Sequence, residues 1–171
     1  MLKFNSNGGL MMKKIMVMLL LVVVMIFIGC SSGQELLADQ NLKKLVSREV
    51  GTAPEELKVE DLKQIKNLRI NDQSALGLGD IKSLTGIKHL SQLKALNLKD
   101  NKIKDITPLQ NLTELKYLNL SNNQIEDIKP VTKLDKLMYL HISNNNFDIS
   151  SGSETMQVIK KLRKKGIKVK Y

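Results

Sequence analysis

The residue with the clearest capacity for chemistry in this 171-residue sequence is Cys30, its only cysteine. A thiol can be acylated, oxidised or used as a metal ligand, and its surroundings decide among these fates. A single cysteine excludes an intramolecular disulfide and any zinc site built from several thiolates. Cys30 follows the basic pair Lys13 and Lys14 and then Ile15–Ile28, an apolar run of 14 residues without a charge or a proline. About 20 apolar residues are needed to span a bilayer, so the shorter run indicates the core of a secretory signal peptide.

The residues that end this run, Phe27-Ile28-Gly29-Cys30, resemble the lipobox of bacterial lipoproteins. In that family the cysteine receives a thioether-linked diacylglycerol, and the leader is cleaved in front of it. The resemblance implies that residues 1–29 are a signal peptide and that Cys30 carries a diacylglycerol and a fatty acyl group such as palmitate. It also implies that residues 30–39 are a lipidated tether on the extracytoplasmic face of the cell membrane. The alternative is a free thiol buried at the end of a core helix.

The start of the chain lies further upstream than such a leader requires. A signal peptide is expected to begin close to its basic residues, and Met11 and Met12 immediately precede Lys13. Gly8 and Gly9 can be encoded by a purine-rich GGAGG, which is a ribosome-binding sequence. We therefore expect translation to start at Met11 or Met12.

No group of residues points to an enzyme. The sequence has no glycine-rich phosphate loop, no HExxH zinc motif and no nucleophile elbow. The two histidines, His89 and His141, are far apart, and the acidic residues recur at regular intervals instead of in pairs. We expect no catalytic residue, no metal ion and no cofactor other than the covalent lipid on Cys30.

The formal net charge of +10 is concentrated at the two ends of the chain. Residues 1–29 carry +3 and residues 154–171 carry +6, which leaves +1 for residues 30–153. A nucleic-acid-binding protein would be expected to have a basic stripe across its main surface. We therefore expect no nucleic-acid partner.

Apolar residues and asparagines recur every 22 residues through the second half of the chain. The clearest columns are Leu90, Leu112 and Leu134; Leu96, Leu118 and Leu140; and Asn101, Asn123 and Asn145. Together with the recurring Asn-x-Ile-x-Asp-Ile-x-Pro pattern, they resemble leucine-rich repeat proteins, and specifically the internalin-type repeats of bacterial surface proteins. The resemblance covers roughly residues 40–171.

The repeat also predicts its own structure. Leu96-x-Leu98 alternates with a period of two, as a half-buried strand does, and stacked coils place equivalent residues about 4.8 Å apart. Each asparagine of the ladder lies where the coil leaves the sheet, so its buried amide can bond to backbone groups that have lost their strand partners. Asn122, one position before Asn123, is expected to be exposed. We predict an α/β solenoid, a short leucine-rich repeat horseshoe segment with parallel strands on its concave face.

The repeats are expected to span residues 62–150, with a cap at each end because open solenoid ends expose core. Leu62 to Ile70 match Leu90 to Leu98 at a spacing of 28, which places six extra residues within Asn71–Asp80. A helix over Gln40–Gly51 resembles the helical N-terminal cap of internalin-like proteins, in a cap of residues 40–61. A helix over Glu154–Lys165 and a following strand resemble the C-terminal cap, residues 151–171. With both caps present, we expect the repeat domain to be complete.

The residues that alternate with the core leucines are predicted to form the concave face, and we expect a partner to bind there. The predicted binding residues are Asn97, Lys99, Tyr117, Asn119, Tyr139 and His141. Tyr117 and Tyr139 share one column on adjacent coils. They either pack as cross-strand neighbours or form an interface hot spot. His141 is expected to be a surface polar residue and not a metal ligand.

These features predict a monomeric, membrane-anchored extracytoplasmic lipoprotein at the cell surface whose concave face binds another protein. A tether of about ten residues spans at most roughly 35 Å, so the partner is expected near the membrane surface. One alternative is a binder of anionic cell-envelope polymer through the basic C-terminal cap, whose lysines otherwise form the solvated face of an amphipathic helix. A second is an intracellular regulatory subunit, which requires that residues 1–29 are not a leader.

Overall fold

The computed structural model describes residues 36–69 and 80–171, which belong to one compact unit, Glu35–Tyr171. The predicted signal peptide, Cys30 and most of the predicted six-residue insertion lie outside the described residues.

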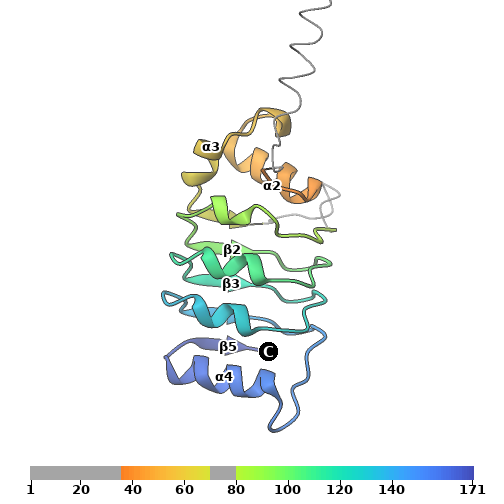
Figure 1. Ribbon diagram of the computed structural model, residues 1–171, viewed down its shortest axis with the longest axis vertical. Coiled ribbons are helices and arrows are strands. Elements are labelled where there is room, and N and C mark those ends of the chain that lie inside the picture. Colours follow the sequence, from red (N-terminus) through yellow and green to blue (C-terminus); the bar gives the residue numbers. More distant parts are fainter. Residues whose placement is uncertain (1–35, 70–79) are drawn as a thin grey trace, which may run out of the picture. The chain divides into compact units, whose positions relative to one another are not determined.

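A parallel sheet runs through the described residues as a ladder of short strands (Figure 1). The strands are β1 (Asn67–Arg69), β2 (Ala95–Asn97), β3 (Tyr117–Asn119), β4 (Tyr139–His141) and β5 (Lys168–Lys170), and they pair in chain order. Asn67 is paired with Ala95 across a spacing of 28, and Ala95 with Tyr117 across a spacing of 22. The predicted leucine-rich repeat solenoid is therefore confirmed, including the longer first spacing.

Short 3-10 helices return the chain on the side opposite the strands (Figure 1). They are η2 (Ile87–His89), η3 (Thr107–Asn111) and η4 (Lys129–Lys133), and the last two have a proline in their first turn. Asp105 Oδ1 accepts from the Thr107 N–H at 2.8 Å, and Asp127 Oδ1 accepts from the Lys129 N–H at the same distance. The coils of η3 and η4 therefore each turn into their helix on an aspartate and a proline.

The core is a continuous column of aliphatic side chains between the strands and the helices. Leu118, Leu120 and Leu140 are 0% exposed, as are the equivalent residues of most coils. Each coil contributes too few of these side chains to form a core alone, so stacking supplies most of the buried apolar area.

The N-terminal cap covers the first coil with two helices, α2 (Gln40–Val50) and α3 (Val59–Lys63), joined through the 3-10 helix η1 (Pro54–Glu56). Helix α2 ends as predicted at Gly51, whose φ of 80° is the left-handed conformation that glycine tolerates. The N–H of Gly51 donates to the Ser47 carbonyl at 2.8 Å.

The folded domain begins earlier than the predicted boundary between tether and cap at residue 40. Leu37 is 0% exposed in the core, and the Ala38 N–H donates to the Thr85 carbonyl at 3.3 Å. Asp39 Oδ1 caps α2, while its Oδ2 accepts from the N–H groups of Lys82 (2.8 Å) and Ser83 (3.2 Å). Residues 36–39 are therefore part of the cap and not of a tether.

The C-terminal cap has the predicted helix and strand. Helix α4 (Glu154–Lys164) begins at Ser153, whose Oγ accepts from the Met156 N–H at 3.2 Å, and Gly166 reverses the chain with φ 85°. Strand β5 then pairs with β4 and ends the sheet (Figure 1). In the described part of the chain, no helix has the length and apolar character needed to cross a membrane.

Candidate functional site

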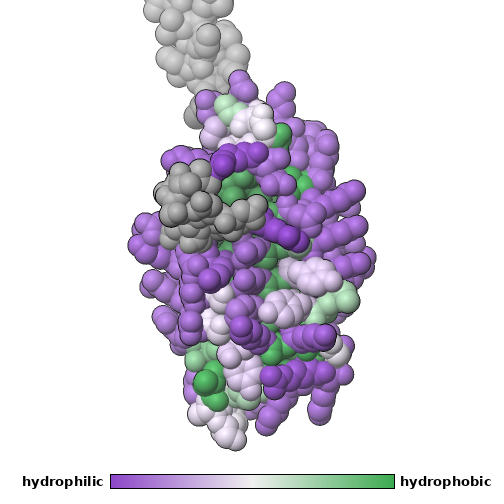
Figure 2. All heavy atoms as spheres, turned by 180° about the vertical axis from the view of Figure 1, so that it is seen from behind, coloured by the Kyte–Doolittle hydropathy of each residue, from purple (hydrophilic) through white to green (hydrophobic). Residues whose placement is uncertain are grey.

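Side chains of the strands line up in two columns on one surface, which we call the strand face. The first column is Asn67, Ala95, Tyr117, Tyr139 and Lys168, and the second is Arg69, Asn97, Asn119, His141 and Lys170. Figure 2 views the molecule from behind and shows pale and green side chains grouped among purple ones in its middle. The predicted binding residues Asn97, Tyr117, Asn119, Tyr139 and His141 therefore occupy one surface, and Lys99 follows the end of β2.

The strand face contains a hollow of about 290 Å³. Its lining residues are Arg69, Ala95, Leu96, Asn97, Tyr117, Leu118, Asn119 and Tyr139. Ala95 lies next to Tyr117 in the first column. The small methyl group of Ala95 beside the large phenol ring of Tyr117 leaves the space that forms the hollow. Tyr117 is 51% exposed, whereas Tyr139 is half-buried. An exposed aromatic ring beside a hollow is a typical anchor of a protein interface.

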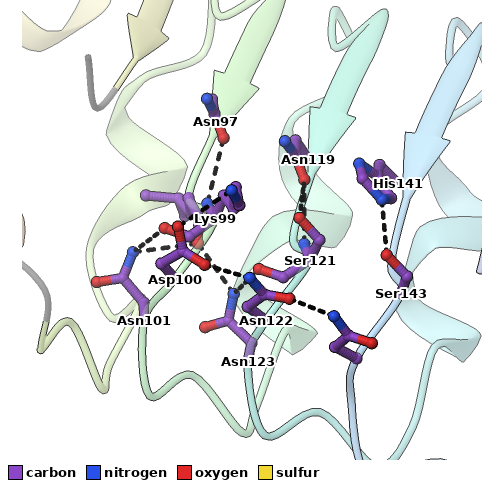
Figure 3. Close-up of polar contacts among 12 residues, drawn as sticks. Asn97, Lys99, Asp100, Asn101, Asn119, Ser121, Asn122, Asn123, His141 and Ser143 are labelled. Carbon is purple, nitrogen blue, oxygen red and sulfur yellow. Dashed lines mark hydrogen bonds and ion pairs between the residues drawn. The ribbon is translucent and has the colours of Figure 1, made fainter. Parts of the chain in front are cut away.

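The second column is held by hydrogen bonds to residues two positions further along the chain (Figure 3). Asn119 Oδ1 accepts from the N–H and the Oγ of Ser121, at 3.0 and 2.8 Å, and Asn97 Oδ1 accepts from the Lys99 N–H at 3.2 Å. The Nδ2 groups of both asparagines have no acceptor among the described residues. The column is therefore rigid and presents amide donors to a ligand.

His141 lies between the aromatic pair and the last strand. Its Nε2 is 2.7 Å from Ser143 Oγ, and its ring meets the Tyr139 ring edge-on with centroids 6.5 Å apart. Burial, followed by the positive charges of Lys170 and Lys99, lowers the pKa of His141 below its usual value. The neutral imidazole is favoured, so His141 contributes a hydrogen-bonding group and not a charge. Within residues 36–69 and 80–171, no cluster of three metal-ligating side chains forms.

The asparagine ladder lies where the strands end (Figure 3). Asn123 Oδ1 accepts from the Ile103 N–H at 3.0 Å, and its Nδ2 donates to the carbonyls of Leu98 and Leu120 at 2.9 and 3.1 Å. Asn101 and Asn145 accept in the same way from Ile81 and Ile125, both at 3.0 Å. Each amide therefore joins two successive coils through buried backbone groups.

A second ladder, which sequence reasoning missed, lies one residue earlier. Asp100, Asn122 and Asn144 have φ values of 58°, 56° and 56°, the left-handed region that asparagine and aspartate tolerate better than most residues. Asn122 Nδ2 donates to Asp100 Oδ1, and Asn144 Nδ2 donates to Asn122 Oδ1 at 2.7 Å (Figure 3). Asn122 is half-buried in this chain of bonds, so the expectation that it is exposed is wrong. The sequence signal was a second polar column at the same spacing.

Several cations near the C-terminal end serve the cap itself. Arg163 donates to the Val169 carbonyl at 3.2 Å, and its guanidinium lies 4.9 Å from the centre of the Tyr171 ring. Lys165 Nζ is 3.3 Å from Asp135 Oδ1, and Lys129 Nζ is 2.6 Å from Glu154 Oε1. Part of the basic character of this end is thus used in attaching α4 to the last coil.

Comparison with known proteins identifies the repeat. Residues 63–125 match the family Leucine rich repeat, and residues 113–152 match Leucine Rich repeats (2 copies). An internalin (InlF) of Listeria monocytogenes has a similar structure, with 29% identity and a TM-score of 0.59 over 67% of this chain. A leucine-rich repeat protein of Leptospira interrogans has the same fold, with 24% identity and a TM-score of 0.52 over 67% of this chain. No curated protein matches the sequence significantly.

The chain spans 33% of the length of the internalin and 28% of the length of the Leptospira protein. Leucine-rich repeat domains are generally protein-binding modules, and those of the internalin type are typically not enzymes. Residues 63–152 of this chain therefore form a leucine-rich repeat domain that resembles the repeat domains of internalins.

Proposed function

We propose that this protein is a lipoprotein, held at the extracytoplasmic face of the cell membrane through Cys30, whose strand face binds another protein. The observation that carries the binding part is the hollow of about 290 Å³ beside Tyr117, a ring that is 51% exposed on a rigid parallel ladder. A large aromatic ring exposed to water is more costly than a polar side chain there, and burying it against a partner regains that free energy.

Rigidity favours binding at this face. The strand residues are fixed by the ladder on both sides, and Asn119 is fixed by two further bonds to Ser121. Few side-chain rotamers are therefore lost when a partner docks, and this lowers the entropic cost of association. On the side of the 3-10 helices, a hollow of about 300 Å³ beside Lys104, Glu126 and Pro130 has no aromatic ring in its lining.

The anchoring part of the proposal rests on the leader-like residues 13–29 and on Cys30. The folded cap begins at Leu36, which is six positions after Cys30. An extended chain spans about 3.3–3.6 Å per residue, which gives a reach of about 20 Å. The repeat domain would then stand close to the membrane, and so would its partner.

The binding site is tested by replacing single residues with a photo-crosslinking amino acid in intact cells. Replacement of Tyr117 or Tyr139 should give a discrete adduct, while replacement of Lys104 or Lys133 on the 3-10-helix side should not. With the captured partner purified, Tyr117→Ala and Tyr139→Ala should each weaken binding by at least about 1 kcal/mol, or roughly fivefold. Lys133 suits this purpose because it has no ion pair among the described residues, whereas the nearby Lys129 pairs with Glu154 at 2.6 Å. If Lys104→Ala and Lys133→Ala lost binding while the two tyrosine variants kept it, the binding site would lie elsewhere.

The anchor is tested by growth with labelled fatty acid. The wild-type protein should incorporate the label and partition into detergent, and Cys30→Ala should do neither. Wild-type protein that stays unlabelled in the cytosolic fraction would overturn the lipoprotein proposal and favour an intracellular role. This experiment is independent of the binding test, because Cys30 lies outside the folded repeat domain.

A further inference from the structure

The charge on the strand face has one sign. Its two columns contain Arg69, Lys168 and Lys170 but no carboxylate. None of these three cations has an ion-pair partner among the described residues. Some lysines elsewhere do form ion pairs, for example Lys102 with Asp80 at 2.7 Å and Lys136 with Glu114 at 2.6 Å.

A column of three lysines borders the strand face, immediately before the strands, and we call it the lysine rim: Lys66, Lys94 and Lys116. The Lys94 N–H donates to the Lys66 carbonyl at 2.7 Å, and the Lys116 N–H donates to the Lys94 carbonyl at 2.8 Å. The parallel ladder therefore stacks the three residues on successive coils, about 4.8 Å apart. Lys66 and Lys94 are exposed, and Lys116 is half-buried.

This arrangement costs the folded protein stability. Like charges on neighbouring strands repel, and none of the rim lysines forms an ion pair within the described residues. Their field reaches neighbouring groups, because Lys94 and Lys116 help to lower the pKa of Glu114, whose main partner is Lys136. At the other end of the face, Lys170 and Lys99 contribute to the lowered pKa of His141. An anionic ligand would offset the repulsion among the rim lysines and the excess positive charge around His141.

We infer that the strand face binds an acidic segment of its partner protein, with carboxylates on Lys66, Lys94 and Lys116 and an apolar side chain in the hollow beside Tyr117. The inference rests on the proposed function and specifies the chemistry of the partner. Lys94 directly precedes Ala95, and Lys116 directly precedes Tyr117, so the rim lies at the start of two strands whose residues line the hollow. A polypeptide that combines acidic and apolar side chains uses both features, whereas a polyanion without apolar groups uses only the rim.

The test uses the purified full-length protein as the target. Peptides that bind it are selected from a displayed library of random 12-residue peptides. Peptides enriched on the wild type should contain more Asp and Glu than the unselected library, together with an apolar residue. The selected peptides are then synthesised and titrated against Lys94→Gln/Lys116→Gln and a matched control, Lys104→Gln/Lys133→Gln, which removes two charges from the opposite side. Glutamine keeps most of the length of the lysine stem, so the change is mainly one of charge.

The double rim variant should bind the selected peptides at least tenfold more weakly, and the control variant within twofold of the wild type. The rim variant should unfold at the same or a higher urea concentration than the wild type, whereas a structural role for the lysines would lower it. Enrichment without an acidic bias, or equal binding to the rim variant, would overturn this inference but not the proposed function. Enrichment of no peptide class would count against both. Inorganic polyphosphate that binds as tightly as the selected peptides would indicate a polymer site and would also overturn the inference.

Discussion

Replacing Asn123 with alanine tests the asparagine ladder at its centre. Asn123 is 7% exposed and accepts from the Ile103 N–H at 3.0 Å, which has no other acceptor among the described residues. The carbonyls to which Asn123 donates are better protected. Leu98 keeps a bond from Asn101 Nδ2 at 3.1 Å, and Leu120 keeps one from Asn145 Nδ2 at 3.0 Å. The alanine variant therefore leaves one fully unpaired buried donor.

A buried, unpaired backbone group costs about 1–3 kcal/mol, and this sets the expected loss in the free energy of unfolding for Asn123→Ala. For a domain of this size, 1 kcal/mol lowers the melting temperature by about 4 °C, so the expected loss is roughly 4–12 °C. Asn123→Asp should also destabilise the protein, because a carboxylate would face carbonyl oxygens at 2.9 and 3.1 Å. Burial and the two facing carbonyl oxygens raise the pKa of that carboxyl, so the aspartate variant should become more stable as the pH falls towards 4.

Urea unfolding followed by circular dichroism measures both variants. Asn111→Ala is the control, since Asn111 is exposed and its side chain has no hydrogen bond within the described residues. The control should unfold within about 0.5 kcal/mol of the wild type, as is usual for surface substitutions. Equal unfolding free energies for Asn123→Ala and Asn111→Ala would refute the role of the Asn123 amide in joining successive coils.

Three further perturbations address the second ladder, the strand face and the N-terminal cap. Asn122→Ala should cost about 1 kcal/mol, because asparagine tolerates its φ of 56° better than alanine does. Asn122→Gly should cost less in the same urea experiment, and equal losses would assign the effect to the side chain alone. The free energy of unfolding should decrease as the pH falls from 7 to 5.5, because burial and two lysines lower the pKa of His141 and the unfolded chain then binds more protons. This slope should be smaller in His141→Gln, and an unchanged slope would exclude the histidine as its source. Gly86→Ala should destabilise the protein by at least about 1–3 kcal/mol, since φ is 90° and a Cβ would lie 2.0 Å from the Leu36 carbonyl oxygen. Limited proteolysis should then cut near Leu36 first, and a wild-type digestion pattern would show that the contact is not needed.

The repeat made most of the fold predictable. A period of 22 residues fixes which residues stack, so the pairing of Leu96 with Leu118 follows from the sequence. The end of α2 at Gly51 was predictable for a local reason, because glycine adopts the left-handed conformation that ends a helix. These features depend on spacing or on one residue's backbone preference, and both are visible in a single sequence.

Contacts across long distances in the chain were not predictable in the same way. Leu36 and Leu37 form a short apolar pair without periodicity, and their place in the core depends on Gly86, which is some 50 residues later. Asn122 belongs to a polar column whose burial depends on a bond to Asp100 on the preceding coil. In both cases the sequence shows the residue types but not the partner.

The candidate site was predictable in its columns but not in its shape or charge. Alternation with the leucines correctly placed Tyr117 and Tyr139 side by side in one column. The hollow depends on the small side chain of Ala95, whose effect appears only when the neighbouring rings are in position. The lysine rim was hidden because recurring lysines are usual on solvated coils, and only the structure shows which of them have acidic partners.

The early start of the N-terminal cap determines how the protein would carry a mechanical load. If Cys30 is held in the membrane, any pull on the domain enters at Leu36 and is first resisted by the backbone bond of Ala38 and the two bonds to Asp39 Oδ2. These contacts and the buried Leu37 attach the segment to the first coil, while the repeats beyond are joined by the whole ladder. Residues 36–39 would therefore detach first and add at most about 14 Å of extension with the repeats still folded. Detachment of this segment would then absorb a small displacement between the partner and the membrane, while the strand face stays folded.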